Sequence, residues 1–277
     1  MKGGERDSHA LNRIGELNGS CVFLSASIPD PQRSEAFRQL DDAQREIEQA
    51  VIALARAVFA HGGRLVFGGH PTISPLVALV AGEYIDHKFE TTIEGGVLEN
   101  SSEPPVVIHQ LDVYRPEIPD ATMRLEQFGF ARVIWHETLL AEKNSERIVG
   151  SSPYPASLRR MRGSMLRGDS DRSRPPIGMV CIGGMEGVFE EASIFYELDL
   201  GPIFVLGRTG GASELLAHPR TQDNVTAPLV RPIVIDDLML NETTLRLRGL
   251  DGEMFDAPPR FTPYPAIVDE IVRRLAG

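Results

Sequence analysis

The stretch that decides the fold is "RLVFGGHPTISPLVALVAGEY", Arg64 to Tyr84. Four residues typical of a buried strand run into Gly68-Gly69, and a run with helical spacing of apolar residues follows Pro71. Glycine lets the backbone turn sharply and lets a ligand approach it closely, while proline is tolerated in the first turn of a helix. A strand, a glycine-rich turn and a helix start in this order are typical of a site for an anion or phosphate.

Similar apolar runs recur along the chain, separated by amphipathic segments. They lie at 21–27, 64–69, 105–111, 131–137, 177–184, 202–208 and 231–237. This alternation predicts an α/β fold of the Rossmann-like, doubly wound type, with a mainly parallel sheet and helices on both faces. We expect a single domain over residues 21–277, preceded by a polar leader at 1–20.

Helices are predicted between and after these strands. In the segment between the first two runs, Ile47, Val51, Leu54 and Val58 recur at helical spacing, and Gly62-Gly63 should end that helix. Further helices are expected after the glycine-rich turns at 68–72 and 183–187, and a last one in "PAIVDEIVRRLA". Segments 101–106, 165–176 and 248–265 are rich in polar residues, glycine or proline and are predicted to be surface loops.

The composition limits the class of partner and the compartment. The 39 acidic and 28 basic residues give a net charge of -11, which argues against binding to a long nucleic acid. Cys21 and Cys181 fall in separate apolar runs, as expected of buried thiols in a reducing compartment. No apolar stretch approaches the roughly 20 residues of a membrane-spanning helix, and the polar start does not resemble a signal peptide. We therefore expect a cytoplasmic protein without a membrane partner.

Small or glycine-rich turns follow four of the predicted strands: "SASIPDP" (25–31), "GGHPT" (68–72), "GGMEG" (183–187) and "GRTGGASE" (207–214). One such turn most often only reverses the chain. Ligands of an open parallel sheet, however, bind beyond the carboxyl ends of its strands, and four turns there favour a shared anion site. The predicted ligand-binding residues are Ser25, Ser27, Arg33, Gly68, Gly69, His70, Thr72, Gly183, Gly184, Met185, Glu186, Gly187, Thr209 and Gly210.

Within this set, the backbone N–H groups of Gly69 and Thr72 are expected to be free and to face the crevice. Arg33 is the expected phosphate partner, and Ser27 either contacts the ligand or caps the following helix. The chain contains no G-x-G-x-x-G after the first strand, no P-loop, no zinc-binding pattern and no G-x-S-x-G. Neither a metal nor a cofactor is therefore expected, and His70 and His136 are interpreted as structural or ligand-contacting histidines.

Two acidic residues, Glu190 and Glu191, follow the third of these turns. One interpretation is that they only complement the helix dipole, worth about 0.3–1 kcal/mol each. The other is that one of them binds ribose hydroxyls or acts as a general acid or base on a glycosidic bond. The apolar positions Val188, Ala192 and Phe195 mark the core side of the helix, and this register points Glu191 to the crevice and Glu190 to solvent.

The pairing of "VFGGHPTISPLV" with "IGGMEGVFEEA" resembles the SLOG superfamily over roughly residues 20 to 210. This Rossmann-like group includes the LOG phosphoribohydrolases and the DprA-type DNA-processing proteins. The opening "SASIP" and "VFGGHPTISPLV" look most like the SLOG proteins of prokaryotic conflict and antiviral defence systems. The LOG motif P-G-G-x-G-T-x-x-E falls on Gly183, Gly184, Gly187 and Glu191. Ile182 stands in place of its proline, Val188 replaces its threonine, and one extra residue precedes Gly187.

The resemblance also implies an arginine upstream, which "SLRRMRGSML" supplies as Arg159, Arg160 or Arg162. Arg162 is preferred, although a solvated basic helix face explains the same residues. Glu191 and Arg162 are the catalytic candidates that the resemblance implies.

Two functions follow from this resemblance. The first is a module that senses or sequesters a nucleotide-derived small molecule, such as an ADP-ribose or cyclic ADP-ribose relative. The alternative is an N-glycoside hydrolase, LOG-like, acting on nucleoside monophosphates or NAD derivatives. A scaffold without a ligand is a third reading. The resemblance further implies a homo-oligomer, and it leaves open whether an effector protein encoded nearby is a partner.

Overall fold

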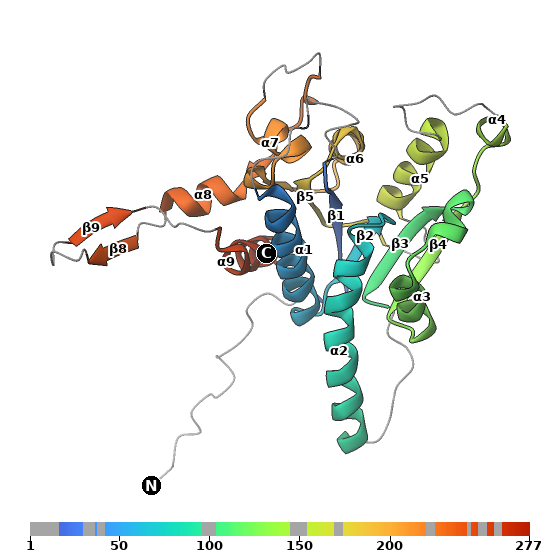
Figure 1. The fold of residues 1–277 in the computed structure, drawn as a ribbon, viewed down its shortest axis with the longest axis horizontal. Coiled ribbons are helices and arrows are strands. Elements are labelled where there is room, and N and C mark those ends of the chain that lie inside the picture. Colours follow the sequence, from blue (N-terminus) through green and yellow to red (C-terminus); the bar gives the residue numbers. More distant parts are fainter. Residues whose placement is uncertain are drawn as a thin grey trace, which may run out of the picture.

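The protein has a parallel α/β architecture built on a seven-stranded sheet (Figure 1). The structure is a computed structural model that describes residues 17–29, 37, 42–95, 104–144, 154–168, 174–219, 225–242, 245–248, 254–257 and 262–277. The strands are β1 (Cys21–Ser27), β2 (Arg64–Gly68), β3 (Val106–Leu111), β4 (Ala131–His136), β5 (Gly178–Gly183), β6 (Ile203–Leu206) and β7 (Ile233–Val234). All seven predicted strands are present, and the doubly wound, Rossmann-like fold is confirmed.

The strand order is β4-β3-β2-β1-β5-β6-β7, and every neighbouring pair is parallel. The chain winds outward from β1 to β4 and then returns to the other side of β1 to form β5. The carboxyl ends of β1 and β5 therefore mark the topological switch point, where open α/β sheets bind their ligands.

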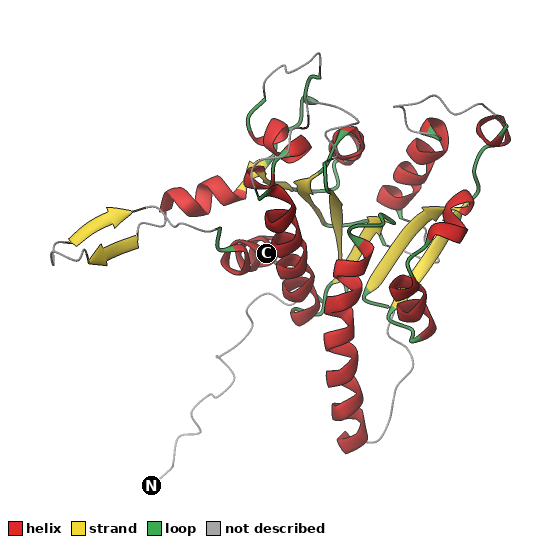
Figure 2. Ribbon diagram, viewed as in Figure 1, coloured by secondary structure: helices red, strands yellow, loops and turns green. Residues whose placement is uncertain are grey.

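Helices cover both faces of the sheet because alternate strand residues are apolar on both sides (Figure 2). In β1, Val22 and Leu24 belong to one core cluster and Cys21 and Phe23 to the other. The first face carries α1 (Ala43–Ala60), α2 (Ser74–Gly95), α3 (Asp120–Gln127) and α9 (Tyr264–Leu275). The second carries α5 (Pro155–Arg167), α6 (Glu186–Glu197) and α7 (Gly211–Ala217). The remaining helices are η2 (Asp112–Glu117), α4 (Leu140–Lys143), η3 (Gly207–Thr209) and α8 (Ile235–Glu242).

The helix predicted between the first two strands is α1, and it ends where the glycines predict. Gly62 adopts φ of 68°, a left-handed conformation that glycine takes without strain. The amide of Leu17 donates to the His61 carbonyl at 2.9 Å, and that of Gly19 to the Gly62 carbonyl at 2.8 Å. Leu17 is also buried in the core, so the last residues of the predicted polar leader pack against the fold.

The seventh strand was expected at 231–237 but spans only Ile233–Val234, because α8 begins at Ile235. The buried carboxylate of Asp236 accepts hydrogen bonds from the amides of Arg208 and Asp237, at 2.7 and 3.1 Å. These contacts anchor the first turn of α8 beside η3.

Two predicted loops contain regular structure. In the region 248–265, β9 (Met254–Ala257) pairs antiparallel with β8 (Leu245–Arg248), although the sequence there was interpreted as a loop. Helix α5 continues through Arg167, inside the loop predicted for 165–176. Residues 101–103, 169–173, 249–253 and 258–261 of these loops lie outside the described residues. Within the described residues, none of the helices has the length and apolar character needed to cross a membrane.

Candidate functional site

A cleft of about 950 Å³ lies along the carboxyl ends of the central strands. Ser27 at the end of β1, the turn after β2, the η2–α3 segment after β3 and the turn after β5 all line it, and α5 contributes a further wall. The cleft therefore includes the switch point between β1 and β5, the position expected for a ligand in this fold.

The turn after β5 is shaped by two glycines in the left-handed region. Gly183 has φ of 60° and Gly184 has φ of 87°. The Gly184 amide donates to the Ser27 carbonyl at 2.7 Å, which ties the turn to the end of β1. The chain then enters α6 at Glu186, so the first turn of that helix borders the cleft.

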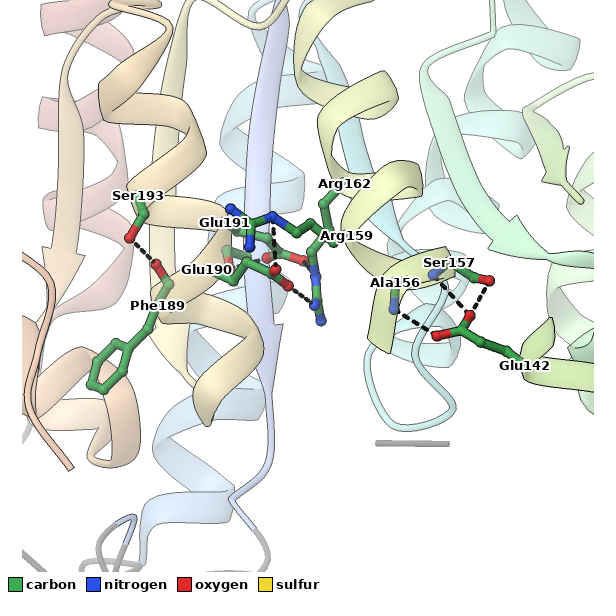
Figure 3. Close-up of polar contacts among 10 residues, drawn as sticks. Glu142, Ala156, Ser157, Arg159, Arg162, Phe189, Glu190, Glu191 and Ser193 are labelled. Atoms are coloured by element: carbon green, nitrogen blue, oxygen red, sulfur yellow. Dashed lines mark hydrogen bonds and ion pairs between the residues drawn. The ribbon is translucent and has the colours of Figure 1, made fainter. Parts of the chain in front are cut away.

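Arg162 of α5 reaches two carboxylates on α6 (Figure 3). Its Nε donates to Glu191 Oε1 at 3.1 Å, and its Nη1 donates to Glu190 Oε2. The other oxygen of Glu191, Oε2, accepts a hydrogen bond from the hydroxyl of Ser25. The Glu191 carboxylate is thus fixed from two directions, by a strand and by a helix on the same face of the sheet.

Burial and neighbouring charges shift the pKa values of Glu191 and Arg162 in opposite directions. Burial raises the pKa of Glu191 above its ordinary range, and the charge of Arg162 with the Ser25 hydrogen bond only partly opposes it. Burial lowers the pKa of Arg162, but the two carboxylates outweigh it and the pKa is raised. Arg162 therefore stays charged. Its positive charge stabilises the adjacent carboxylates of Glu190 and Glu191 in the partly buried wall of the cleft.

The cleft wall is acidic among the described residues. Its lining includes Glu117, Glu186, Glu190 and Glu191, against the single cation Arg162 and the histidine His70. Ionised carboxylates only accept hydrogen bonds, so they pair with hydroxyl or N–H donors of a ligand rather than with phosphate oxygens. This part of the cleft favours a sugar over a phosphate.

The structure brings most predicted site residues to the cleft. Those that line it are Ser27, Gly68, Gly69, His70, Arg162, Met185, Glu186, Gly187 and Glu191. Ser25, Thr72, Gly183, Gly184, Thr209 and Gly210 are described but are not part of its lining. Arg33, the expected phosphate partner, lies outside the described residues.

The expectation that Gly69 and Thr72 offer free N–H groups is wrong. The Gly69 amide donates to the His109 carbonyl at 2.8 Å, continuing the parallel ladder beyond β2. The Thr72 amide donates to Nδ1 of His70 at 3.4 Å. The Gly69 amide is therefore satisfied by β3 and the Thr72 amide within the turn, before α2 begins at Ser74.

The turn after β6 supports the site from outside the cleft. Thr209 is fully buried, and its hydroxyl accepts from the Gly183 amide at 2.7 Å and donates to the Leu206 carbonyl at 2.6 Å. The Ala212 amide donates to the Gly184 carbonyl at 2.9 Å. Three of the four predicted turns therefore reach the cleft, while the fourth holds the glycine turn after β5 in place.

Glu190 was predicted to point to solvent, and this is wrong in part. Its side chain is 28% exposed against 12% for Glu191, which agrees with the more inward position of Glu191. Glu190 nevertheless lines the cleft, because Arg162 lies between the two helices and draws both carboxylates toward it. Arg159 adds a second ion pair to Glu190 at 3.7 Å.

The η2–α3 segment was missed by sequence reasoning. It contributes Tyr114, Glu117, Ile118, Pro119 and Thr122 to the cleft. The stretch "VYRPEIPD" (113–120) directly follows the third predicted strand, and all parallel strands end at the same edge of their sheet. A search for turns after every strand, rather than for glycine alone, would have found it.

The described part of the chain holds no group of three or more His, Cys, Asp or Glu side chains that could bind a metal ion. A scan of protein-family models gave no match to this chain, and a search of curated proteins gave none either.

Proposed function

We propose that the protein binds a ribose-containing, nucleotide-derived small molecule, of the ADP-ribose class, in the cleft at the switch point. The observation that carries this proposal is the Glu191 carboxylate, held by Ser25 and Arg162 in the wall of that cleft. A carboxylate fixed in this way accepts hydrogen bonds from vicinal ribose hydroxyls without losing side-chain entropy on binding.

Two further features support a nucleotide-derived ligand. The cleft volume of about 950 Å³ lies at the upper end of the range of roughly 300–1,000 Å³ common for small-molecule sites. The first turn of α6 also borders the cleft, and backbone N–H groups at the start of a helix bind phosphate or carboxylate. In this proposal the ribose binds at the carboxylates and an anionic group of the ligand binds at the backbone N–H groups of the first turn of α6.

One observation favours hydrolysis as a second candidate function. Burial raises the pKa of Glu191, and a carboxyl tuned upward in this way transfers protons more effectively near neutral pH. In that reaction water attacks the anomeric carbon of the ribose, the N-glycosidic bond breaks, and the leaving base takes up a proton. Glu191 would serve as the acid–base group, and Arg162 would keep it oriented.

Exchanging one carboxylate at a time tests the proposal. Glu191→Gln should weaken the binding of ADP-ribose at least tenfold, about 1.4 kcal/mol, because the amide has one accepting oxygen in place of two for Ser25, Arg162 and the ligand hydroxyls. Glu190→Gln is the matched control, and its effect should be smaller because Glu190 is more exposed and does not contact Ser25. Isothermal titration calorimetry measures both, and melting temperatures check that the variants are folded.

The same samples separate binding from turnover. Chromatography after incubation with ADP-ribose, NAD or AMP detects any free base, and its loss in Glu191→Gln would favour the hydrolase. Equal affinities for the two variants and the wild-type protein would contradict the assignment of the site to Glu191. Absence of binding to any of these compounds would reject the proposed function.

A further inference from the structure

Thr122, in the first turn of α3, has a side-chain hydroxyl without a hydrogen-bond partner among the described residues. The residue is 1% exposed and belongs to the lining of the cleft. An unsatisfied buried hydroxyl costs about 1–3 kcal/mol, and most buried polar groups in proteins are paired. An unpaired hydroxyl on a residue that lines a ligand cleft indicates a group kept for a ligand, and a ligand reaches this solvent-inaccessible oxygen through a change in the Thr122 rotamer or in the cleft wall.

The surroundings of Thr122 are mostly apolar, although Glu117 of the same segment also lines the cleft. Tyr114, Ile118, Pro119 and Leu158 line the cleft together with it, and they come from η2, the η2–α3 turn and α5. This apolar part follows β3, while the two glutamates follow β5, and β2 and β1 lie between those strands. Three spacings of about 4.8 Å separate β3 from β5, so the two parts are about 14 Å apart at the sheet.

Gln110, another polar residue of the cleft lining, already has hydrogen-bond partners for its side chain. The Gln110 amide donates to the Gly69 carbonyl at 2.9 Å, and its oxygen accepts from the Leu111 amide at 3.0 Å. The Thr122 hydroxyl can both donate and accept, which suits it to the edge of a heteroaromatic ring with adjacent nitrogen and exocyclic groups.

We infer that this apolar part is the nucleobase subsite of the cleft, and that Thr122 is a specificity-determining residue that pairs with a polar atom on the edge of the base. The inference rests on the proposed function, in which the ribose lies near Glu191 in the ionic part of the cleft. Tyr114, Pro119 and Leu158 then cover the faces of the planar ring, and the hydroxyl gains on binding the partner that it lacks in the free protein.

Removing the hydroxyl while keeping the shape of the side chain tests this inference. Thr122→Val should lower the affinity for ADP-ribose and AMP about tenfold and leave the affinity for ribose 5-phosphate, which has no base, unchanged. The melting temperature of the free protein should stay the same or rise, because the variant no longer buries an unpaired hydroxyl. Thr122→Ser keeps a hydroxyl and should restore most of the affinity for AMP.

Thr138→Val is the matched control for stability. Thr138 is also 1% exposed, but its hydroxyl donates to Asp112 at 2.6 Å, so this variant should melt at a lower temperature. If Thr122→Val lowers the melting temperature in the same way, the Thr122 hydroxyl is satisfied in the free protein and the inference fails. Unchanged binding of AMP, or an equal loss for ribose 5-phosphate, also overturns it while leaving the proposed function intact. Failure of all three probes to bind the wild-type protein rejects the proposed function itself, and the inference with it.

Discussion

Replacing Arg162 with methionine is expected to lower the free energy of unfolding by about 3–5 kcal/mol, the usual cost of removing one partner from a largely buried ion pair. The Arg162 side chain is 17% exposed, and it is held between the carboxylates of Glu190 and Glu191. Methionine retains much of the apolar volume, so the loss reports mainly on the two carboxylates left without a cation. Denaturant unfolding followed by circular dichroism measures it.

The loss should depend on pH in a defined direction. Burial already raises the pKa of Glu191 in the folded protein, and removing Arg162 raises it further because Arg162 opposes that shift. A carboxyl with a folded-state pKa above its unfolded value binds protons preferentially when folded. Its contribution to stability is therefore present at low pH and lost as the pH rises through the folded-state pKa. The deficit of Arg162→Met should shrink as the pH falls from neutral toward the ordinary titration range of glutamate.

Arg159→Met provides the control for this experiment. Arg159 lies on the same helix and pairs with Glu190 at 3.7 Å, but its side chain is 72% exposed. Exposed ion pairs contribute about 0–1 kcal/mol, so this variant should be nearly as stable as the wild-type protein. Equal losses for Arg159→Met and Arg162→Met, or a deficit for Arg162→Met that grows at low pH, would contradict the assigned role of Arg162.

Gly183→Ala is expected to destabilise the fold by about 3 kcal/mol and to weaken binding in the cleft. The left-handed conformation at φ of 60° costs a residue with a side chain roughly 1–2 kcal/mol. The new Cβ would also lie 2.6 Å from Ile47 Cδ1 and 2.8 Å from the backbone oxygen of Ser27, and relieving such overpacking costs about 1–3 kcal/mol. Because the Ser27 carbonyl accepts the Gly184 amide, the turn that starts α6 would shift.

Gly62→Ala separates the two contributions. Gly62 has a similar φ of 68°, but a Cβ there would meet no atom within 4 Å. Gly62→Ala should therefore lower the free energy of unfolding only by the cost of the left-handed conformation, about 1–2 kcal/mol, and should leave ligand affinity unchanged. Thermal and chemical unfolding of both variants measure the difference, and equal destabilisation would show that crowding against Ser27 and Ile47 is unimportant.

Much of the fold was predictable because it depends on local patterns. Each strand of the main sheet is a short apolar run, and burial on both faces requires such runs whatever the details of packing. The helix between the first two strands ends at Gly62 because a left-handed residue there needs no side chain. The errors arose where a tertiary contact overrides local sequence. Only Ile233–Val234 of the predicted seventh strand form a strand, and the residues from Ile235 onward belong to α8, since Asp236 is buried against η3.

The candidate site was predictable only in outline. The sequence by itself determined that glycine-rich turns follow the strands and that one acidic side chain faces inward, because turn chemistry and helical period are local properties. Only the tertiary structure decided that Arg162 lies between Glu190 and Glu191, that the turn after β6 supports the site without lining it, and that η2 and α3 complete the cleft. The physical reason is that these features depend on where separate elements meet around the switch point. Sequence periodicity gives the face of each helix, but the packing of α5 against α6 determines which charges come within reach of each other.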